Sequence, residues 1–261
     1  MPREKISAIL VTYNEARKIR RCLDSLRWVD EIVVVDQSSD DGTVAICKEY
    51  TDKVFVVSNK GFCEPDRITA AQKAQHDWIF YIDADEKISP QLRREIEEIL
   101  LRKPSSDVFY LPRKNIFAGK WIRGSGWYPG YVPRLFKKGC VEFPEEIHAD
   151  IKPRGKIGYL KEPLIHYTCE DVQEYIRKLN RYTGVLARQA YQQGLRITSR
   201  NFFNKLFLLP LAYALQKLIF KKGFRDGFLG FFIVFLTFLT VFLMHAKLWE
   251  IEKHDSSADT Q

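Results

Sequence analysis

The sequence predicts a mixed α/β fold in which helices flank a mostly parallel sheet, followed by a helical C-terminal appendage. Two observations predict the sheet: apolar runs of strand length recur through the first hundred residues, and helix-like apolar spacing lies between them. Such alternation is typical of parallel strands joined by right-handed crossovers. A third observation predicts the appendage, since residues 202–220 and 228–244 are strongly apolar.

The predicted elements of the first hundred residues follow one another in a regular order. Continuous apolar runs suit strands buried on both faces, and apolar residues three and four apart suit helices with one buried side. Ser89 before Pro90 predicts a helix start, because serine caps a helix and proline fits its first turn. Strands are expected at residues 6–11, 31–35, 54–57 and 78–82, and helices at 16–28, 43–50, 68–75 and 90–100.

Three of these strands end in polar residues, at positions 12–15, 36–42 and 83–86. The carboxyl ends of parallel strands share one edge of a sheet, where α/β proteins bind their ligands. Asp83 and Asp85 project to the same side of an extended chain, and two close carboxylates are stabilised by a cation such as Mg²⁺. We therefore expect a site for a phosphate-containing ligand. The alternatives are a solvated acidic turn and, for Asp40 and Asp41, helix capping.

Composition and charge narrow the function classes. Five scattered cysteines without a C-x-x-C pair favour a reducing compartment over a disulfide framework or a zinc site. The N-terminus leads directly into a strand, so we expect no signal peptide and a cytoplasmic catalytic part. The net charge is +8, and residues 151–225 alone carry +11. A basic zone before an apolar segment favours an anionic membrane surface over nucleic acid, for which no motif is visible in the sequence.

Three segments together resemble a known family: I-L-V-T-Y-N-E at 9–15, V-V-V-D-Q-S-S-D-D-G-T at 33–43 and W-I-F-Y-I-D-A-D-E at 78–86. Over essentially residues 5–250 the chain resembles family 2 glycosyltransferases of the GT-A (Rossmann-like) fold, above all lipopolysaccharide-core β-1,4-glucosyltransferases. The resemblance implies a metal-assisted, inverting transfer of a hexose, most simply glucose, from a UDP-sugar to a lipid-linked glycan. Polyprenyl phosphate is the alternative acceptor, and a catalytically inactive sugar-nucleotide-binding or scaffold protein is the alternative class.

The resemblance also implies roles on the donor side. Asp36 would accept a hydrogen bond from the uracil N–H, and Asp83 would lie near the ribose or the sugar. Asp85, with Asp83 as a second candidate, would ligate Mg²⁺ or Mn²⁺ between the two phosphates. The residues expected to border the nucleotide are Thr12, Tyr13, Glu15 and Arg67, the last beside Ile68, where many relatives have an asparagine.

On the acceptor side, related enzymes share a W-Y-P segment followed by R-L-F, here at 127–129 and 134–136. Arg134 is therefore a candidate for contacting the donor diphosphate or an anionic acceptor, because a guanidinium pairs well with phosphate. Trp127 and Tyr128 would stack on a sugar or pack in the core. His166 would reach the diphosphate or serve as a structural histidine.

The general base is the open point of the predicted mechanism. Relatives often carry a His-Glu pair in the acceptor segment, whereas Ala149 follows His148 here. A base must take the proton of the acceptor hydroxyl. The candidates are Glu146, which we expect first, and Glu145, His148 and Asp150.

The C-terminal third is predicted to meet a membrane surface. A helix is expected over 171–193, and a basic turn at 221–227 separates the two apolar segments. The charge-free residues 228–244 cover roughly 25 Å as a helix, short of a ~30 Å hydrocarbon core. Lying in the interface is therefore expected rather than spanning, with a homo-oligomer interface as the alternative. The predicted parts are a catalytic domain at 1–168, a membrane-associating region at 169–250 and a polar tail at 251–261.

Overall fold

A computed structural model describes residues 2–59, 61, 63–143 and 151–258. The chain divides into two compact units. Residues 1–114 and 130–167 form the first, here called the α/β unit, and residues 115–129 and 168–261 form the second, the helical unit. The segment 115–129 belongs with the helices of the second unit.

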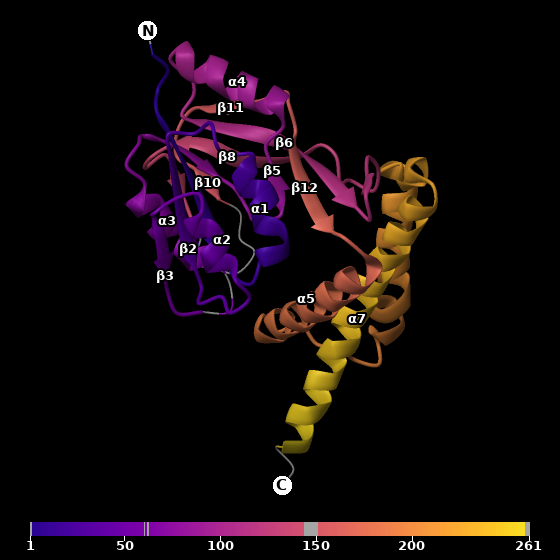
Figure 1. The fold of residues 1–261 in the computed structure, drawn as a ribbon. Helices are drawn as coiled ribbons and strands as arrows, with labels where there is room; N and C mark the ends of the chain where they lie inside the picture. The colour runs from indigo at the N-terminus through magenta and orange to yellow at the C-terminus, as the bar shows by residue number, and fades with distance from the viewer. Residues whose placement is uncertain (1, 60, 62, 144–150, 259–261) are drawn as a thin grey trace. The chain divides into compact units, whose positions relative to one another are not determined.

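The α/β unit is built on a sheet whose first half is parallel (Figure 1). Parallel pairing joins β3 (Val54–Val56), β2 (Glu31–Asp36), β1 (Ile6–Thr12) and β4 (Trp78–Tyr81), side by side in that order. The sheet then continues through antiparallel β8 (Gly130–Lys137) to β6 (Val108–Phe117), β12 (Leu164–Cys169) and β5 (Glu86–Lys87). Outside this path, β11 (Ile157–Tyr159) pairs with β6, and β9 (Val141–Glu142) with β10 (Lys152–Pro153).

Helices cover both faces of the parallel half. Ile6, Ala8 and Leu10 of β1 pack in a core cluster that takes in α1 (Ala16–Asp24), α2 (Thr43–Lys48) and α4 (Pro90–Leu101). The alternate residues Ile9 and Val11 pack in a second cluster on the side of α3 (Glu64–Lys73). Because both faces are covered, the strand is apolar at every position but Ser7 and Thr12. The predicted α/β fold with a C-terminal helical appendage is confirmed.

Two helix starts show how local chemistry sets the boundaries. The Ser89 hydroxyl accepts a hydrogen bond from the N–H of Leu92 at 3.1 Å, as the Ser-Pro pair predicts. The start predicted at residue 68 is wrong, since α3 begins at Glu64. Pro65 lies in its first turn, where the missing N–H costs no hydrogen bond, so the helix extends further toward the N-terminus.

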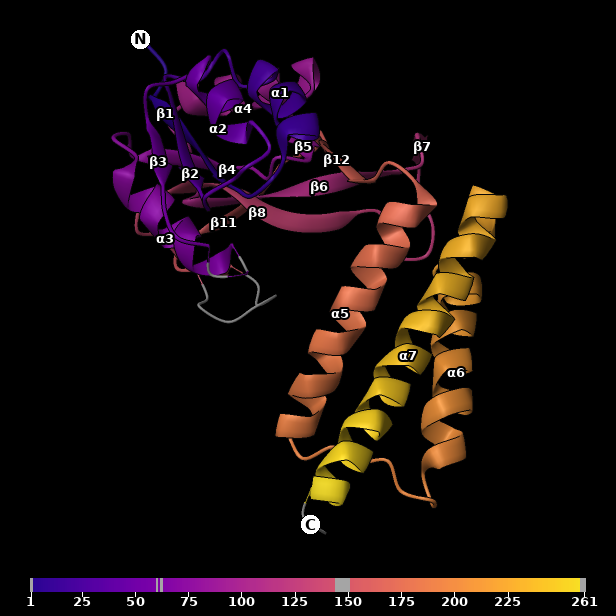
Figure 2. The same ribbon diagram turned by 60° about the horizontal axis from the view of Figure 1, so that its bottom comes forward.

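The helical unit consists mainly of long helices that pack side by side (Figure 2). α7 packs against α5 and against a helix formed by η1, α6 and η2, in which π-helical turns flank an α-helical centre. The Asp171 carboxylate caps α5 by accepting the N–H of Glu174 at 2.7 Å. The bounds are α5 (Val172–Gln192), η1 (Asn204–Leu208), α6 (Leu209–Leu215), η2 (Gln216–Phe220), η3 (Gly223–Asp226) and α7 (Phe228–Ala258).

The turn between α6 and α7 is held to the segment 115–129. The Asp226 carboxylate accepts the backbone N–H groups of Arg123 at 3.0 Å and Gly124 at 2.6 Å. The Lys120 ammonium donates to the Asp226 carbonyl at 3.1 Å. A Cβ on Gly230 would lie 1.9 Å from the Gly223 carbonyl oxygen, so only glycine permits this approach. In the same segment β7 (Lys120–Trp121) pairs with the end of β6.

α7 continues to Ala258, well beyond the apolar residues 228–244. Among the described residues, its portion Phe228–His254 is the one helix long and apolar enough to cross a membrane, judged by length and composition alone.

Candidate functional site

The polar strand ends of the α/β unit lie at one edge of the parallel sheet. Thr12 at the end of β1 is directly beside Asp36 at the end of β2, and the polar residues after β4 follow the next strand along. This juxtaposition follows from parallel pairing, which brings carboxyl ends together. Thr12, Asp36, Asp83 and Asp85 therefore come from three adjacent strands, as predicted.

Asp36 is fully buried and hydrogen-bonded on both oxygens. Its Oδ2 accepts the Thr12 hydroxyl at 2.9 Å and the Ser39 hydroxyl at 2.6 Å. Its Oδ1 accepts the Ser39 N–H at 2.8 Å. These three donors offset the cost of burying a carboxylate and fix its orientation at the strand end.

The loops after β1 and β2 are tied to each other. Asn14 adopts a left-handed φ of 54°, and its side-chain oxygen accepts the N–H of Asp40 at 3.0 Å. Ser38 has a φ of 58°, a conformation that side chains other than Asn, Asp and Gly rarely adopt. The Asp41 carboxylate accepts the N–H of Ala16 in α1 and of Thr43 in α2, both at 3.0 Å. Asp41 thus bonds to the first residue of both helices, although their N-cap residues are Glu15 and Gly42.

Residues of α3 approach the same strands. Asp66 is buried and accepts the Gln37 side-chain amide at 2.6 Å. The Arg67 guanidinium lies 5.0 Å from the ring centre of Tyr81, the last residue of β4. The sequence interpretation missed the Gln37–Asp66 pair. The signal available was Gln37 directly after Asp36 at a strand end.

Arg134 joins two carboxylates of the D-A-D-E segment. Its Nη2 donates to Asp83 and, at 2.7 Å, to Glu86, and its guanidinium carbon lies 4.4 Å from the centre of the Tyr81 ring. The second oxygen of Asp83 accepts the Tyr81 hydroxyl. The Arg134 residue is 5% exposed, and its guanidinium is engaged by these carboxylates. If Arg134 also contacts a diphosphate or an acceptor, as predicted, its guanidinium would have to bind that group while it is paired with Asp83 and Glu86.

The two carboxylates that share Arg134 differ in their proton affinity. For Asp83, burial would raise the pKa, but the positive charges of Arg134 and Arg67 outweigh it and hold the pKa well below its ordinary value. For Glu86, burial raises the pKa, and the charge of Asp83 adds to the effect against the opposing charge of Arg134. The Asp83 side chain keeps 34% exposure, whereas the Glu86 side chain has none. Asp83 is thus the anionic member that faces outward.

Asp85 lies next to His166 of β12. The His166 Nε2 is 3.4 Å from an Asp85 carboxylate oxygen, with the two side chains 14% and 19% exposed. The backbone reinforces this contact, because the N–H of Tyr167 donates to the Asp85 carbonyl at 2.9 Å. Within the described residues, no group of three or more His, Cys, Asp and Glu side chains is placed to hold a metal ion.

The remaining predicted site residues do not take part in these contacts. Tyr13 is exposed, and Glu15 precedes α1 and lies 4.0 Å from Lys18. Trp127 packs edge-on against Phe117 in the core of the helical unit. The rings of Tyr128 and Trp121 are 5.1 Å apart in the same unit. The four candidate bases, Glu145, Glu146, His148 and Asp150, fall outside the described residues.

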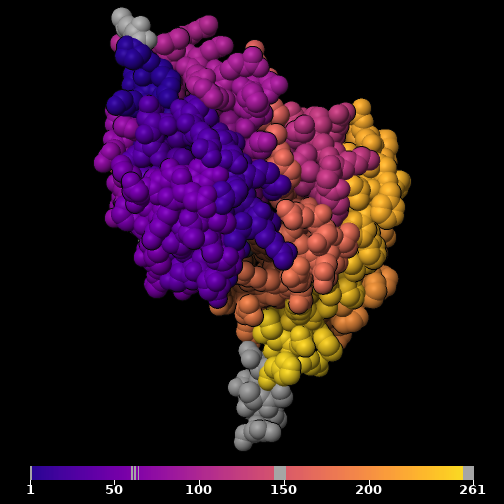
Figure 3. Space-filling view, in the orientation of Figure 1, coloured from indigo at the N-terminus to yellow at the C-terminus, as the bar shows by residue number. Residues whose placement is uncertain are grey.

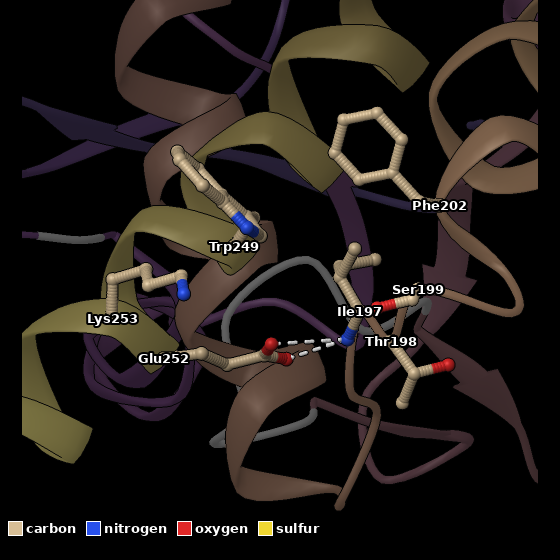
Figure 4. A pocket seen from close by; sticks show the side chains of 7 residues that line it. All are labelled: Ile197, Thr198, Ser199, Phe202, Trp249, Glu252 and Lys253. Atoms are coloured by element: carbon tan, nitrogen blue, oxygen red, sulfur yellow. Dashed lines mark hydrogen bonds between the residues drawn. The ribbon is translucent and has the colours of Figure 1, made fainter.

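Two cavities lie away from the strand-end edge. One, of about 470 Å³, is at the α5–α6 connection, where the Glu252 carboxylate accepts the N–H of Ile197 at 2.8 and 3.1 Å (Figure 4). Trp249 and Phe202 line it with Lys253, Thr198 and Ser199. The other, of about 410 Å³, lies at the amino ends of the strands, beside Glu31 and Lys53. Glu31 accepts hydrogen bonds from Ser7, Lys53 and Gln75 there, so its role is structural.

Comparison with known proteins gives consistent relatives. Residues 7–149 match the family model described as Glycosyl transferase family 2. A lipopolysaccharide core biosynthesis glycosyltransferase, LpsC of Rhizobium meliloti, is 30% identical over 96% of this chain and 94% of its own length. An uncharacterized glycosyltransferase of Rickettsia felis is 29% identical over 95% of this chain and 90% of its own. Among solved structures, S. aureus TarS 1–349 covers 98% of this chain at 17% identity, with a TM-score of 0.49.

Proposed function

Because the chain belongs to glycosyl transferase family 2 and is a glycosyltransferase, we propose that it moves a hexose from a UDP-sugar to a lipid-linked glycan of the lipopolysaccharide-core type. Glucose is the hexose we propose. The acceptor class rests on the relative from Rhizobium meliloti, which is named for lipopolysaccharide core biosynthesis. The observation that carries the donor side is the meeting of Asp36, Asp83 and Asp85 at one sheet edge.

Asp36 is the proposed recognition group for the nucleobase. Its Oδ1 accepts one hydrogen bond from a described residue, and a carboxylate oxygen can accept two. A second acceptor position would suit the N–H of uracil once the base displaces the groups that bury this carboxylate. Thr12 and Ser39 hold the carboxylate in place, so the base would meet a fixed acceptor. Arg67 and the exposed Tyr13 would border the nucleotide, and Glu15 would lie beside it.

Asp85 and His166 are the residues we propose for Mg²⁺ or Mn²⁺. The Asp85 carboxylate fits such an ion, since carboxylate oxygen suits both metals, and the imidazole of His166, 3.4 Å away, would be a weaker ligand for these hard cations. Two protein groups are sufficient where phosphate oxygens and water complete the coordination. A bound ion would offset the negative charge of the departing diphosphate. The Asp83 oxygens are engaged by Tyr81 and Arg134, so we assign Asp83 to the donor sugar or ribose instead.

On the acceptor side, the reaction requires removal of the hydroxyl proton as the oxygen attacks the anomeric carbon. Glu146 is the proposed base. Trp127 and Tyr128 remain proposed sugar contacts, although Trp127 is largely committed to packing. The proposed location is the cytoplasmic face of a membrane, where a lipid-linked acceptor would be reached.

The test is turnover of UDP-glucose by the full chain with Mn²⁺ and bacterial membrane extract as acceptor, read as UDP release. Asp85→Asn should lower the rate on the order of 10²- to 10³-fold. Asp52→Asn changes an exposed aspartate before β3 and should leave the rate unchanged. UDP binding in Mn²⁺ is measured alongside, and Asp36→Asn should weaken it about tenfold or more.

The outcomes separate the alternatives. Full activity in Asp85→Asn would show that the metal assignment is wrong. Binding of UDP by the wild type without any turnover on membrane extract would favour the inactive sugar-nucleotide-binding class. Turnover that needs only polyprenyl phosphate would replace the proposed acceptor.

A further inference from the structure

One side of the helix η1–α6–η2 is apolar and uncovered. Large side chains that are two-fifths or more exposed recur at every fourth position: Phe203, Phe207, Leu211, Leu215 and Ile219. A π-helical turn takes more residues than the 3.6 of an α-helix, so the π turns at both ends keep this four-residue stripe on one side. The residues Leu206, Pro210 and Ala214 form a second such stripe, which is buried.

The apolar stripe lies opposite a side of the helix that carries two lysines. Residues two positions apart on a helix of about four residues per turn point in opposite directions. Lys205 therefore lies across the helix from Phe207, and Lys217 lies across from Leu215 and Ile219. Leu209 and Tyr213 share the side of these two lysines, so that side is mixed, whereas the exposed stripe is apolar at every position.

Further exposed apolar side chains lie in the turn and on α7. Phe220 and Phe228 are 78% and 80% exposed, and Phe224, Phe231 and Phe235 are each more than half exposed. Only 28% of the most apolar window of α7 is buried, so it is not an ordinary core helix. The atoms of the 200–227 segment and of α7 that are visible in Figure 3 are orange and yellow. The stripe, the turn and this part of α7 are here called the apolar face.

Exposed cations alternate with these aromatic residues at the turn. Lys221, Lys222 and Arg225 are exposed between Phe220, Phe224 and Phe228. Aromatic residues and cations mixed in this way match a surface that is apolar below and negatively charged above. An anionic phospholipid bilayer has that chemistry.

We propose that the apolar face lies in the outer part of an anionic phospholipid bilayer, with the α6–α7 pair parallel to the membrane plane rather than across it. The inference deepens the proposed function and rests on it for the purpose of the contact, which is to reach a lipid-linked acceptor.

Two features oppose a spanning arrangement. α5 packs along α7, and Lys247 of α7 donates to Asn180 and Thr183 of α5 at 2.6 to 2.8 Å. A spanning α7 would carry the cationic α5 into hydrocarbon or lose this contact. The turn is also bound to Arg123 and Gly124 through Asp226, so it cannot cross the hydrocarbon core without carrying that polar segment with it.

Vesicle flotation of the purified full chain tests the proposal, with no donor or acceptor present. The wild type should bind vesicles of phosphatidylglycerol and phosphatidylethanolamine, and bind phosphatidylcholine vesicles at least tenfold less. Leu211→Glu and Phe228→Glu should each lower binding about tenfold or more. Leu101→Glu is the matched control, because Leu101 in the α/β unit is 53% exposed against 48% for Leu211, and it should bind as the wild type does.

Unchanged binding in both variants would overturn the proposal. So would a dimer, detected by light scattering without vesicles, that Leu211→Glu dissociates, because a second copy would then cover the face. UDP binding in Mn²⁺ should be equal in the wild type and Leu211→Glu. If neither the wild type nor Leu211→Glu binds UDP, the result would count against the proposed function and not against the membrane contact.

Orientation is tested by labelling proteoliposomes with a membrane-impermeant maleimide and locating the label by mass spectrometry. Lys222→Cys lies before α7 and His254→Cys lies near its C-terminal end, so the two flank the apolar part of the helix and should both react from the same side. Reaction of only one from outside, with the other reacting after detergent is added, would show a spanning helix and contradict the in-plane arrangement.

Discussion

The strand-end edge of the α/β unit buries charged side chains, whereas the helical unit exposes aromatic ones. Asp36 and Glu86 have no exposure, and Arg134 has 5%, yet each has partners of matching charge or hydrogen-bonding type. Phe220 and Phe228 keep about four-fifths of their surface open. Both arrangements depart from the usual distribution, in which charges are outside and large apolar groups are inside.

The difference separates two ways in which a protein prepares for a ligand. A buried charge is tolerated only when it is paired, so the α/β unit holds its carboxylates in fixed positions before any donor arrives. Exposed apolar surface is instead incomplete by itself and is stabilised when an apolar partner covers it. Specific recognition is therefore expected of the first region, and non-specific surface binding of the second.

Removing the cation from the buried cluster should have the largest effect. Arg134→Met leaves Asp83 and Glu86 without their shared partner and should lower the free energy of unfolding by about 3–5 kcal/mol. Arg154→Met breaks an exposed pair with Glu142 at 2.7 Å and should cost about 1 kcal/mol or less. Urea unfolding measures both, and equal effects would contradict the distinction between buried and exposed pairs.

Adding a methyl group to a glycine of the helical unit should change the free energy of unfolding by less, and the sign of the change should depend on the site. Gly230→Ala places a Cβ against the Gly223 carbonyl and should destabilise the protein by about 1–3 kcal/mol. Gly184→Ala, inside α5, meets only the Lys247 ammonium at 3.9 Å and should stabilise by about 0.5–1 kcal/mol. Thermal unfolding of the two variants compares them, and stabilisation by Gly230→Ala would disprove the close approach.

Loss of the contact between Asp226 and the segment 115–129 should have the next largest effect on the free energy of unfolding. Asp226→Ala removes the acceptor of two backbone N–H groups and should cost about 1–2 kcal/mol. Asp52→Ala, at an exposed position, is the control. Limited proteolysis near Arg123 reports on the segment itself, and unchanged protection would show that other contacts hold it.

The smallest effects are expected in the pH dependence of stability at the strand-end edge. The raised pKa of Glu86 means that its contribution is full below about pH 4.5 and is lost as the pH rises. The lowered pKa of Asp83 means that its contribution is present above about pH 3.8 and is lost as the pH falls. Relative to the wild type, Glu86→Gln should therefore gain stability with rising pH, and Asp83→Asn should gain it with falling pH. Slopes of the same sign in urea unfolding at a series of pH values would refute this division.

Much of the α/β unit could be predicted because its signals are local. Each strand of the parallel half is a short apolar run, and Ser89-Pro90 and Asp171 cap the helices that follow them. The start of α3 was misplaced because residues 64–67 lack apolar spacing, and only Pro65 indicates a helix start. At the site, Asp36 and Asp85 were predicted from strand ends, whereas Gln37 and Asp66 are 29 residues apart and meet only through the packing of α3.

The sequence by itself determined the alternation of strands and helices over the first hundred residues, the family and the strand ends that carry the carboxylates, because hydrophobic period and capping depend on neighbouring residues. Only the tertiary structure decided which carboxylate faces Arg134 and which faces His166, since Arg134 and His166 arrive from β8 and β12, far along the chain. It also decided which apolar residues remain outside. In the helix η1–α6–η2 apolar residues lie on several sides, and packing against α7 covers one of them.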